Sequence, residues 1–232
     1  MTKSALLIDF DNIFSALWSL DQRTAIKFAS EPADWLQILA NSYLIEDTRR
    51  WLFARCYLNP AGFVSSPEGE SERLYFSRFR PGFVRAGFEV VDCPAIARGG
   101  KNAADIRIVI DALDLLSHRT HFDEFVIASG DSDFTPLLQR LRAEDRRIAV
   151  LSPGFLAAAY SAVADRIIGF DALEGILNAD SEQCDTSSPH NGAEVTGTEA
   201  ENSAAAEARI FASFIRGRYE TATGPLNLAA LA

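Results

Sequence analysis

Short apolar runs alternate with stretches of helical spacing along the first 177 residues, and this alternation constrains the fold more than any other feature. The runs cover residues 5–9, 52–58, 87–92, 124–128 and 147–151. Several are continuously apolar, which is typical of strands covered on both faces. Strands that alternate with helices form right-handed crossovers. We therefore predict an α/β fold, a three-layer α/β/α sandwich around a mainly parallel five-stranded sheet.

The helices between these runs are expected at residues 34–50, 72–86, 103–118, 134–144 and 155–168. In the third of them, five apolar side chains at helical spacing would form one apolar face: Ile106, Val109, Ile110, Leu113 and Leu116. Ligands of such sheets bind beyond the carboxyl ends of the strands. The residues that follow each run are therefore the first candidates for function.

Carboxylates stand at three of the positions that this rule selects. They are Asp9 with Asp11 and Asn12 just after it, Asp105 near the start of a helix, and Asp131 with Asp133 after the fourth run. Carboxylates that gather in one place repel one another, so protons or cations must neutralise them. A hard divalent ion with oxygen ligands is the usual solution, and such a site suits phosphoryl chemistry.

Each carboxylate also has a purely structural interpretation. Asp133 would be the N-cap of the following helix, Asp105 would complement a helix dipole, and Asp11 would face water in a turn. Asp9 and Asp131 directly follow apolar strands, where burial of an unpaired carboxylate is costly. These two residues therefore support the functional interpretation most strongly.

Four motifs resemble those of the NYN domain family, a branch of the PIN-like nucleases. They are LLIDFDNIF, GGKNAADIRIVIDALDLL, FVIASGDSDFTPLLQRLRAEDRRIAVLSP and AVADRIIGFDAL, in this order over roughly residues 3–177. The resemblance implies a ribonuclease, expected to be an endonuclease, that uses Mg²⁺ or Mn²⁺ to hydrolyse RNA phosphodiester bonds. It implies that Asp9, Asp105 and Asp131 hold the metal and that Asp133 is a fourth catalytic carboxylate. It also implies that Asn12 orients a ligand or phosphate.

Basic side chains concentrate between residues 73 and 101, where six Lys and Arg stand against two acidic residues. Arg98 and Lys101 flank a Gly-Gly pair just before the helix that carries Asp105. Glycines permit close backbone approach, and a helix N-terminus favours anions. We therefore predict that Arg98 and Lys101 bind RNA, and we count Ser129 as a further candidate for a hydrogen bond to a ligand or phosphate.

Aromatic side chains are interleaved with these basic ones, namely Tyr75, Phe76, Phe79 and Phe83. A basic belt with stacking rings suits the phosphates and bases of a single strand. Phe76, Phe79 and Phe83 fall at helical spacing, however, so we expect these three rings in the core.

The formal net charge of −10 argues at first against a polyanionic partner. Residues 178–208, however, hold seven acidic side chains, no Lys or Arg and few large apolar groups. We expect a nuclease domain at 1–177, an acidic disordered linker at 178–204 and a helical segment at 205–232. The final GPLNLAALA resembles the opening of an OST-HTH (LOTUS) domain. We expect a truncated domain of that kind, with docking of the helix on the main domain as the alternative.

The sequence also indicates where the protein is located and which other functions are compatible with it. The chain has no apolar run of about 18 residues, no signal-peptide pattern and only three widely spaced cysteines, so we expect a cytoplasmic protein without membrane contact. Formation of a homo-oligomer is compatible with the sequence.

A haloacid-dehalogenase-like phosphatase is one alternative function, with Asp9 as nucleophile and Asp11 as general acid, although Ile13 replaces the usual Thr or Val. A non-catalytic RNA-binding or scaffold protein is the other.

Overall fold

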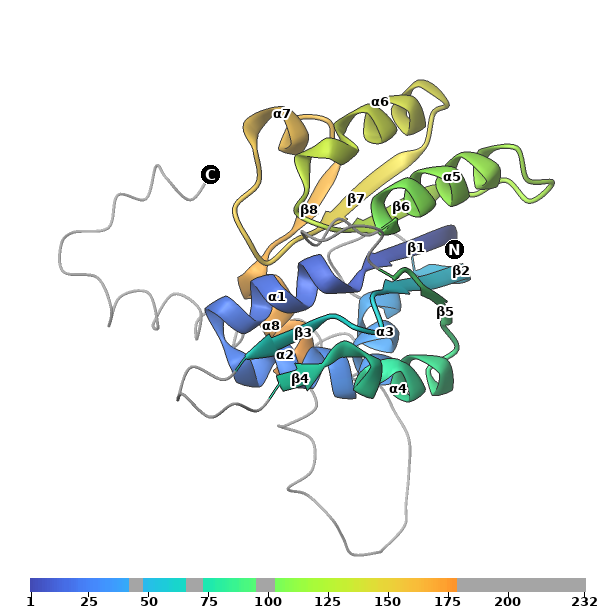
Figure 1. Ribbon diagram of the computed structural model, residues 1–232. Coiled ribbons are helices and arrows are strands. Elements are labelled where there is room, and N and C mark those ends of the chain that lie inside the picture. Colours follow the sequence, from blue (N-terminus) through green and yellow to red (C-terminus); the bar gives the residue numbers. More distant parts are fainter. Residues whose placement is uncertain (42–47, 66–72, 95–102, 179–232) are drawn as a thin grey trace, which may run out of the picture. The chain divides into compact units, whose positions relative to one another are not determined.

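Six parallel strands form the central sheet of the computed structural model, which describes residues 1–41, 48–65, 73–94 and 103–178 (Figure 1). They are β1 (Thr2–Asp9), β2 (Arg49–Leu58), β5 (Glu89–Asp92), β6 (Glu124–Ala128), β7 (Arg147–Leu151) and β8 (Arg166–Ile168). Their order across the sheet is β5-β2-β1-β6-β7-β8, and each neighbouring pair is parallel. All six carboxyl ends therefore meet at one edge, which we call the carboxyl edge.

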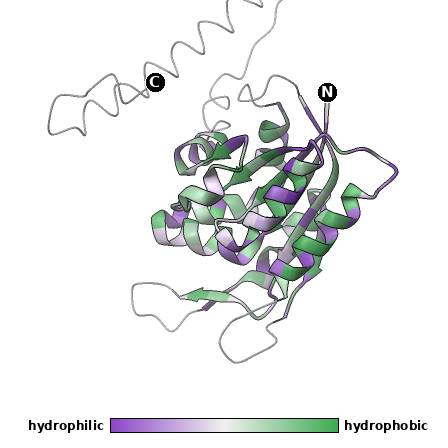
Figure 2. Cartoon of the chain, turned by 90° about the horizontal axis from the view of Figure 1, so that it is seen from above, coloured by the Kyte–Doolittle hydropathy of each residue, from purple (hydrophilic) through white to green (hydrophobic). Residues whose placement is uncertain are grey.

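Helices cover both faces of this sheet, which confirms the three-layer α/β/α sandwich. One face packs against α1 (Phe10–Leu20), α2 (Gln22–Ser30), α3 (Pro32–Asn41), α4 (Arg80–Arg85) and α8 (Phe170–Asn178). The other face packs against α5 (Ala104–Leu116), α6 (Thr135–Ala143) and α7 (Ala158–Ser161). In Figure 2 the strands are largely hydrophobic and lie between helices that carry both hydrophobic and hydrophilic residues. This pattern is that of a sheet buried on both sides.

The sheet has one strand more than the five that we predicted. The additional strand is β8, which lies in a stretch predicted to be a helix at 155–168. The helix there is only the short α7, and β8 has three residues. Such short elements contain too few residues for either periodicity to show, which is why the sequence pattern misled us.

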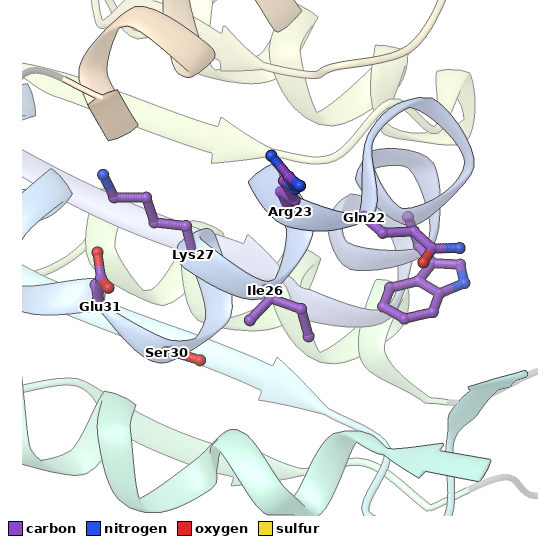
Figure 3. A pocket seen from close by; sticks show the side chains of 7 residues that line it. Gln22, Arg23, Ile26, Lys27, Ser30 and Glu31 are labelled. Carbon is purple, nitrogen blue, oxygen red and sulfur yellow. The ribbon is translucent and has the colours of Figure 1, made fainter. Parts of the chain in front are cut away.

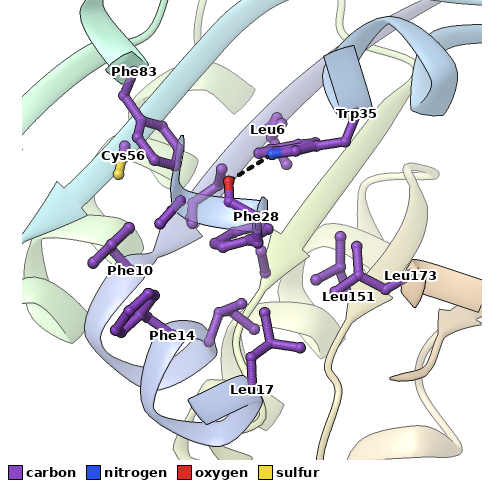
Figure 4. Close-up of a cluster of buried hydrophobic side chains, with 14 of the residues drawn as sticks. Leu6, Phe10, Phe14, Leu17, Phe28, Trp35, Cys56, Phe83, Leu151 and Leu173 are labelled. Carbon is purple, nitrogen blue, oxygen red and sulfur yellow. Dashed lines mark hydrogen bonds between the residues drawn. The ribbon is translucent and has the colours of Figure 1, made fainter. Parts of the chain in front are cut away.

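The core on the α1 side is rich in aromatic rings (Figure 4). Phe10 stacks on Phe14 with ring centroids 5.3 Å apart, and Phe28 stacks on Trp35 at 5.1 Å. The indole Nε1 of Trp35 donates to the carbonyl oxygen of Phe28 at 2.9 Å, so this buried polar atom is satisfied. The three rings predicted to be core, Phe76, Phe79 and Phe83, are all buried here.

The apolar face that we predicted for α5 is wrong in part. Ile106, Ile110 and Leu113 are 65%, 48% and 38% exposed. The helix instead turns a second stripe to the sheet, consisting of Ala104, Ile108, Asp111, Ala112 and Leu115. Asp111 belongs to that stripe because it accepts a hydrogen bond from Tyr57 Oη at 2.7 Å and pairs with the guanidinium of Arg55. Apolar spacing alone does not reveal such partners.

Two other expected helices are shorter than predicted. Of the helix predicted at 34–50, the structure has α3, which ends at Asn41. Arg49 and Arg50 belong to β2, and residues 42–47 lie outside the described part of the chain. The region 72–86, predicted to be one helix, instead contains β4 (Arg73–Tyr75), a 3-10 helix η1 (Phe76–Phe79) and α4. Strand β4 pairs antiparallel with β3 (Phe63–Ser65), and together they form a small hairpin after β2.

The predicted linker and C-terminal segment lie outside the described residues, apart from Asn178, which ends α8. No helix among residues 1–41, 48–65, 73–94 and 103–178 has the length and apolar character needed to span a bilayer.

Candidate active site

Asp9 occupies the turn between β1 and α1 at the carboxyl edge. It is the last residue of β1 and the N-cap of α1, and its carboxylate accepts a hydrogen bond from the Asn12 amide at 3.3 Å. Aspartate is a preferred N-cap because its oxygen satisfies an amide that the helix cannot. The residue is only 5% exposed. The strand-to-helix turn therefore places a carboxylate in the interior of the protein.

Strand β6 brings the second group of predicted residues to Asp9. Ala128 pairs with Ile8 in the neighbouring strand, so Ser129 follows directly beside Asp9. The Ser129 hydroxyl donates to Asp9 Oδ2 at 3.3 Å and accepts from the Asp131 amide, also at 3.3 Å. One buried serine therefore connects the two aspartates that the sequence favoured most.

Asp131 has the capping role that the structural interpretation gave to Asp133. Its Oδ1 accepts from the Asp133 amide at 2.9 Å and caps the 3-10 helix η2 (Ser132–Phe134). Asp133 itself is exposed, and Asp131 is half-buried. The cap belongs to the residue before the turn because the chain becomes helical already at Ser132.

The side chain of Asn12 joins the turn after β1 to the turn after β6. Its Oδ1 accepts from the Gly130 amide at 2.9 Å. A Cβ atom at Gly130 would lie 2.7 Å from Ser152 Oγ, which follows the end of β7. The turn at Gly130 therefore packs closely against Ser152, and a larger residue at position 130 fits only if the Ser152 side chain moves.

Gly130→Ala is expected to lower the free energy of unfolding by about 1–3 kcal/mol, because the new methyl group collides with Ser152 Oγ. The Gly130→Ala/Ser152→Ala double variant removes that oxygen and should recover most of the loss. Urea unfolding of the two single variants and the double variant measures the coupling. Additive effects would contradict this explanation.

The pKa of Asp9 is raised to about 7, which is far above its ordinary value of 3.8. Burial is the largest cause, and the negative charges of Asp105 and Asp11 raise it further. The hydrogen bonds from Asn12 and Ser129 act in the opposite direction. A buried carboxylate with negative neighbours favours either a proton or a bound cation.

Asp105 and Asp11 reach this region from different elements. Asp105 lies in the first turn of α5 and is half-buried. Asp11 lies in the first turn of α1, where its Oδ1 accepts from the Asn59 amide at 3.1 Å, just after β2. The structural interpretation that Asp11 only faces water is therefore wrong, because it holds the chain that leaves β2.

The donor set fits a small divalent ion. Among the described residues, no three His, Cys, Asp or Glu side chains lie close enough together to hold a metal by themselves. Mg²⁺ does not need three, because it takes one or two carboxylates, keeps several waters and uses substrate phosphates as further ligands. Asp9 is a buried carboxylate, and the negative charge of Asp105 raises its pKa further. Asp9 by itself therefore offers the one buried carboxylate that such an ion needs, and the charge of Asp105 adds to the attraction for a cation.

Two buried residues of this site, Tyr160 and Ser152, were not among the predicted site residues. The hydroxyl of Tyr160 in α7 donates to the Ser129 carbonyl at 3.2 Å, and the pKa of Tyr160 is raised by burial and by the charges of Asp131 and Asp9. Ser152 follows β7 and contacts the turn at Gly130. Ser152 lies in the third family motif but was not singled out there, and Tyr160 lies outside the four motifs. Arg98 and Lys101 lie outside the described residues.

A hollow of about 450 Å³ lies along α2 and away from this group of residues (Figure 3). Its lining residues are Trp18, Gln22, Arg23, Ile26, Lys27, Ser30 and Glu31. None of the predicted site residues is among them. The candidate active site is therefore the acidic turn region of the carboxyl edge rather than this hollow.

The sequence belongs to the NYN domain family, which matches residues 3–172. Membership of this family implies a nuclease. A solved structure of a protein of unknown function from Vibrio parahaemolyticus has the same fold, with a TM-score of 0.52 and 21% sequence identity. The similarity covers 74% of this chain and 94% of that chain. A comparison with curated proteins finds no match.

Proposed function

We propose that the chain is a metal-dependent endoribonuclease that hydrolyses RNA phosphodiester bonds at the carboxyl edge of its sheet. The observation that carries the proposal is the buried carboxylate of Asp9, whose pKa is raised to about 7 partly by the charge of Asp105. It stands in a chain of the NYN domain family. A site of this kind gains stability from a cation, and a bound divalent cation can catalyse phosphodiester hydrolysis.

Asp9 and Asp105 would hold the ion, and Asp131 would complete its shell directly or through water. A bound Mg²⁺ or Mn²⁺ would supply Lewis acidity and lower the pKa of a coordinated water. Ser129 keeps the Asp9 carboxylate oriented and buried. Asn12 holds the turn of Gly130 and thereby the position of Asp131. Asp133 is exposed beside them and is the group that meets substrate or water.

Arg98 and Lys101 are proposed to bind the RNA backbone, because they precede the helix that carries Asp105 in the chain. Phosphate contacts of this kind give the affinity its salt dependence. The phosphatase alternative receives no support from the family match, and the Oδ1 of Asp11, its proposed general acid, accepts from Asn59. A cytoplasmic location and the oligomeric state stay predictions.

The proposal predicts cleavage of RNA in Mg²⁺ or Mn²⁺ and none in EDTA. Asp131→Asn keeps the shape and the cap of η2, because asparagine caps as well as aspartate, yet removes one charge from the site. We expect its single-turnover rate to fall by about 100-fold or more. The assay compares wild type and variant on single-stranded and structured RNA. A variant as fast as wild type would remove Asp131 from the mechanism, and a wild type that cuts no RNA would favour a non-catalytic RNA-binding protein.

A further inference from the structure

An exposed aromatic surface accompanies the acidic site on one side. The hairpin of β3 and β4 turns Val64 and Leu74 toward the core and leaves Phe63, Arg73 and Tyr75 on its outer face. Phe63 and Tyr75 are 40% and 44% exposed and stand opposite each other, with ring centroids 5.6 Å apart. The guanidinium of Arg73 lies 4.4 Å from the centre of the Phe63 ring.

The fold attaches this hairpin to the carboxyl edge. It follows β2, whose Tyr57 pairs with Asp9, and Asn59 just beyond is held by Asp11. Ser65 accepts a hydrogen bond from the indole of Trp18 in α1 at 3.3 Å. Figure 1 shows the hairpin beside α1, the helix that Asp9 caps. The aromatic surface is therefore fixed to the same elements that hold the carboxylates.

A second exposed ring accompanies the site on the other side. Phe155 follows β7 and is 95% exposed. It comes three residues after Ser152, which contacts the turn that carries Asp131. In the sheet order, β2 and β7 enclose β1 and β6, the two strands that deliver the aspartates. Three strand spacings of about 4.8 Å separate β2 from β7 in the sheet, so the segments that follow these two strands both leave from the carboxyl edge around the aspartates.

Large exposed rings at both sides of a phosphate-cleaving site suit one ligand class. Every base of a nucleic acid has a flat face that stacks on aromatic side chains and on arginine, and only unpaired bases offer that face. A duplex keeps its bases stacked on one another and cannot use these rings. Arg73 adds a positive charge for the phosphates.

We propose that the hairpin surface (Phe63, Arg73, Tyr75) and Phe155 stack the bases of an unpaired RNA strand on the two sides of the scissile phosphate. This inference rests on the proposed ribonuclease function and specifies its substrate class as single-stranded RNA. The RNA crosses the carboxyl edge from β2 to β7, roughly perpendicular to the β-strands of the sheet. The hairpin surface and Phe155 select unpaired RNA and direct it over the carboxylates.

The test measures binding by fluorescence anisotropy with the full chain carrying Asp131→Asn, in Mg²⁺, so that cleavage does not consume the probe. The probe is a labelled single-stranded oligouridine of about 12 nucleotides, within the range of known single-strand sites, and a duplex of similar length is the comparison. We expect Phe63→Ala/Tyr75→Ala and Phe155→Ala each to weaken single-strand binding about 10-fold. Duplex binding and the salt dependence should not change, because no phosphate contact is removed.

Ring-preserving variants separate stacking from folding. Phe63→Trp, Tyr75→Phe and Phe155→Trp should bind as the parent does. Ile110→Ala, a similarly exposed apolar residue on α5, should also leave binding unchanged. Alanine variants that bind single strands like the parent, or a parent that prefers the duplex, would overturn the inference and assign these rings to another class of partner.

The outcome is distinguishable from that of the proposed function. A chain that binds single strands through these rings but never cuts RNA keeps this inference and loses the ribonuclease. A chain that cuts RNA while all ring variants bind normally keeps the ribonuclease and loses this inference.

Discussion

Asp9→Asn is expected to abolish RNA cleavage and at the same time to stabilise the metal-free protein. The cleavage rate should fall by about 100-fold or more, because the variant loses a buried carboxylate ligand of the ion. Asparagine still caps α1 and still accepts a hydrogen bond. The charge that burial and Asp105 make unfavourable is gone. Lost activity combined with gained stability is the result expected of a functional group that the fold holds in an unfavourable environment.

The stability gain should depend on pH. The Asp9 carboxyl titrates near 3.8 when unfolded and near 7 when folded, so between these values the folded state binds more protons than the unfolded state. Wild-type stability without metal therefore falls as the pH rises through this window. The advantage of Asp9→Asn should be small near pH 4 and reach as much as about 4 kcal/mol above pH 7.

Thermal and urea unfolding in EDTA at pH 5 and pH 8 measures this advantage. Asp21→Asn is the matched control, because Asp21 caps α2 as Asp9 caps α1 but stands outside the site. We expect the control to keep full activity and to show no stabilisation at pH 8. An Asp9→Asn variant that is less stable than wild type at pH 8 would show that the Asp9 charge is not unfavourable in the folded protein.

Glu124→Ala should destabilise the protein by about 3–5 kcal/mol, because it leaves the buried guanidinium of Arg49 without its partner. The side chains of Arg49 and Glu124 are 1% and 6% exposed, and Nε of Arg49 lies 2.7 Å from Oε2 of Glu124. A second contact joins Nη2 to Oε1 at 2.9 Å, and the Ser4 hydroxyl donates to the same carboxylate. The pair connects the starts of β2 and β6, at the end of the sheet opposite the candidate site.

Two variants make this measurement specific. Glu144→Ala breaks the exposed pair of Arg140 and Glu144 and should cost less than about 1 kcal/mol. Arg49→Met/Glu124→Leu replaces both buried charges by apolar groups and should recover most of the loss. Equal effects of Glu124→Ala and Glu144→Ala in urea unfolding would contradict the structural account. Any cleavage activity should persist in Glu124→Ala wherever it is folded, because the pair is remote from Asp9.

The central strands could be predicted from the sequence because each is a continuous apolar run that is buried on both faces. This holds for β1, β6 and β7, whose positions agree closely with the runs. Strand β8 and the pair β3–β4 have three residues each, which is too short for a periodicity. The buried face of α5 depends on the contacts of Asp111 with Tyr57 and Arg55, which are remote in the chain.

Part of the candidate site could also be predicted from the sequence, and part could not. Asp9 and Asp131 follow apolar runs in the sequence, and the topological rule for parallel sheets is enough to bring their strands together. The connection through Ser129 and the support from Tyr160 depend on distances between elements far apart in the chain. No local pattern encodes such contacts. Tyr75 was among the rings considered for stacking in the sequence, whereas its partner Phe63 was missed, because an exposed ring and a core ring look alike in a sequence.

The chemistry of the cleaved ends tests the central claim most directly. Wild-type full-length chain is incubated with a labelled single-stranded RNA in Mg²⁺ and in EDTA, and the product ends are analysed. Hydrolysis by water at the carboxylate site predicts products only in Mg²⁺ and no 2′,3′-cyclic phosphate, because the 2′-hydroxyl is not the nucleophile. Cleavage that persists in EDTA and leaves cyclic phosphate ends would contradict the account.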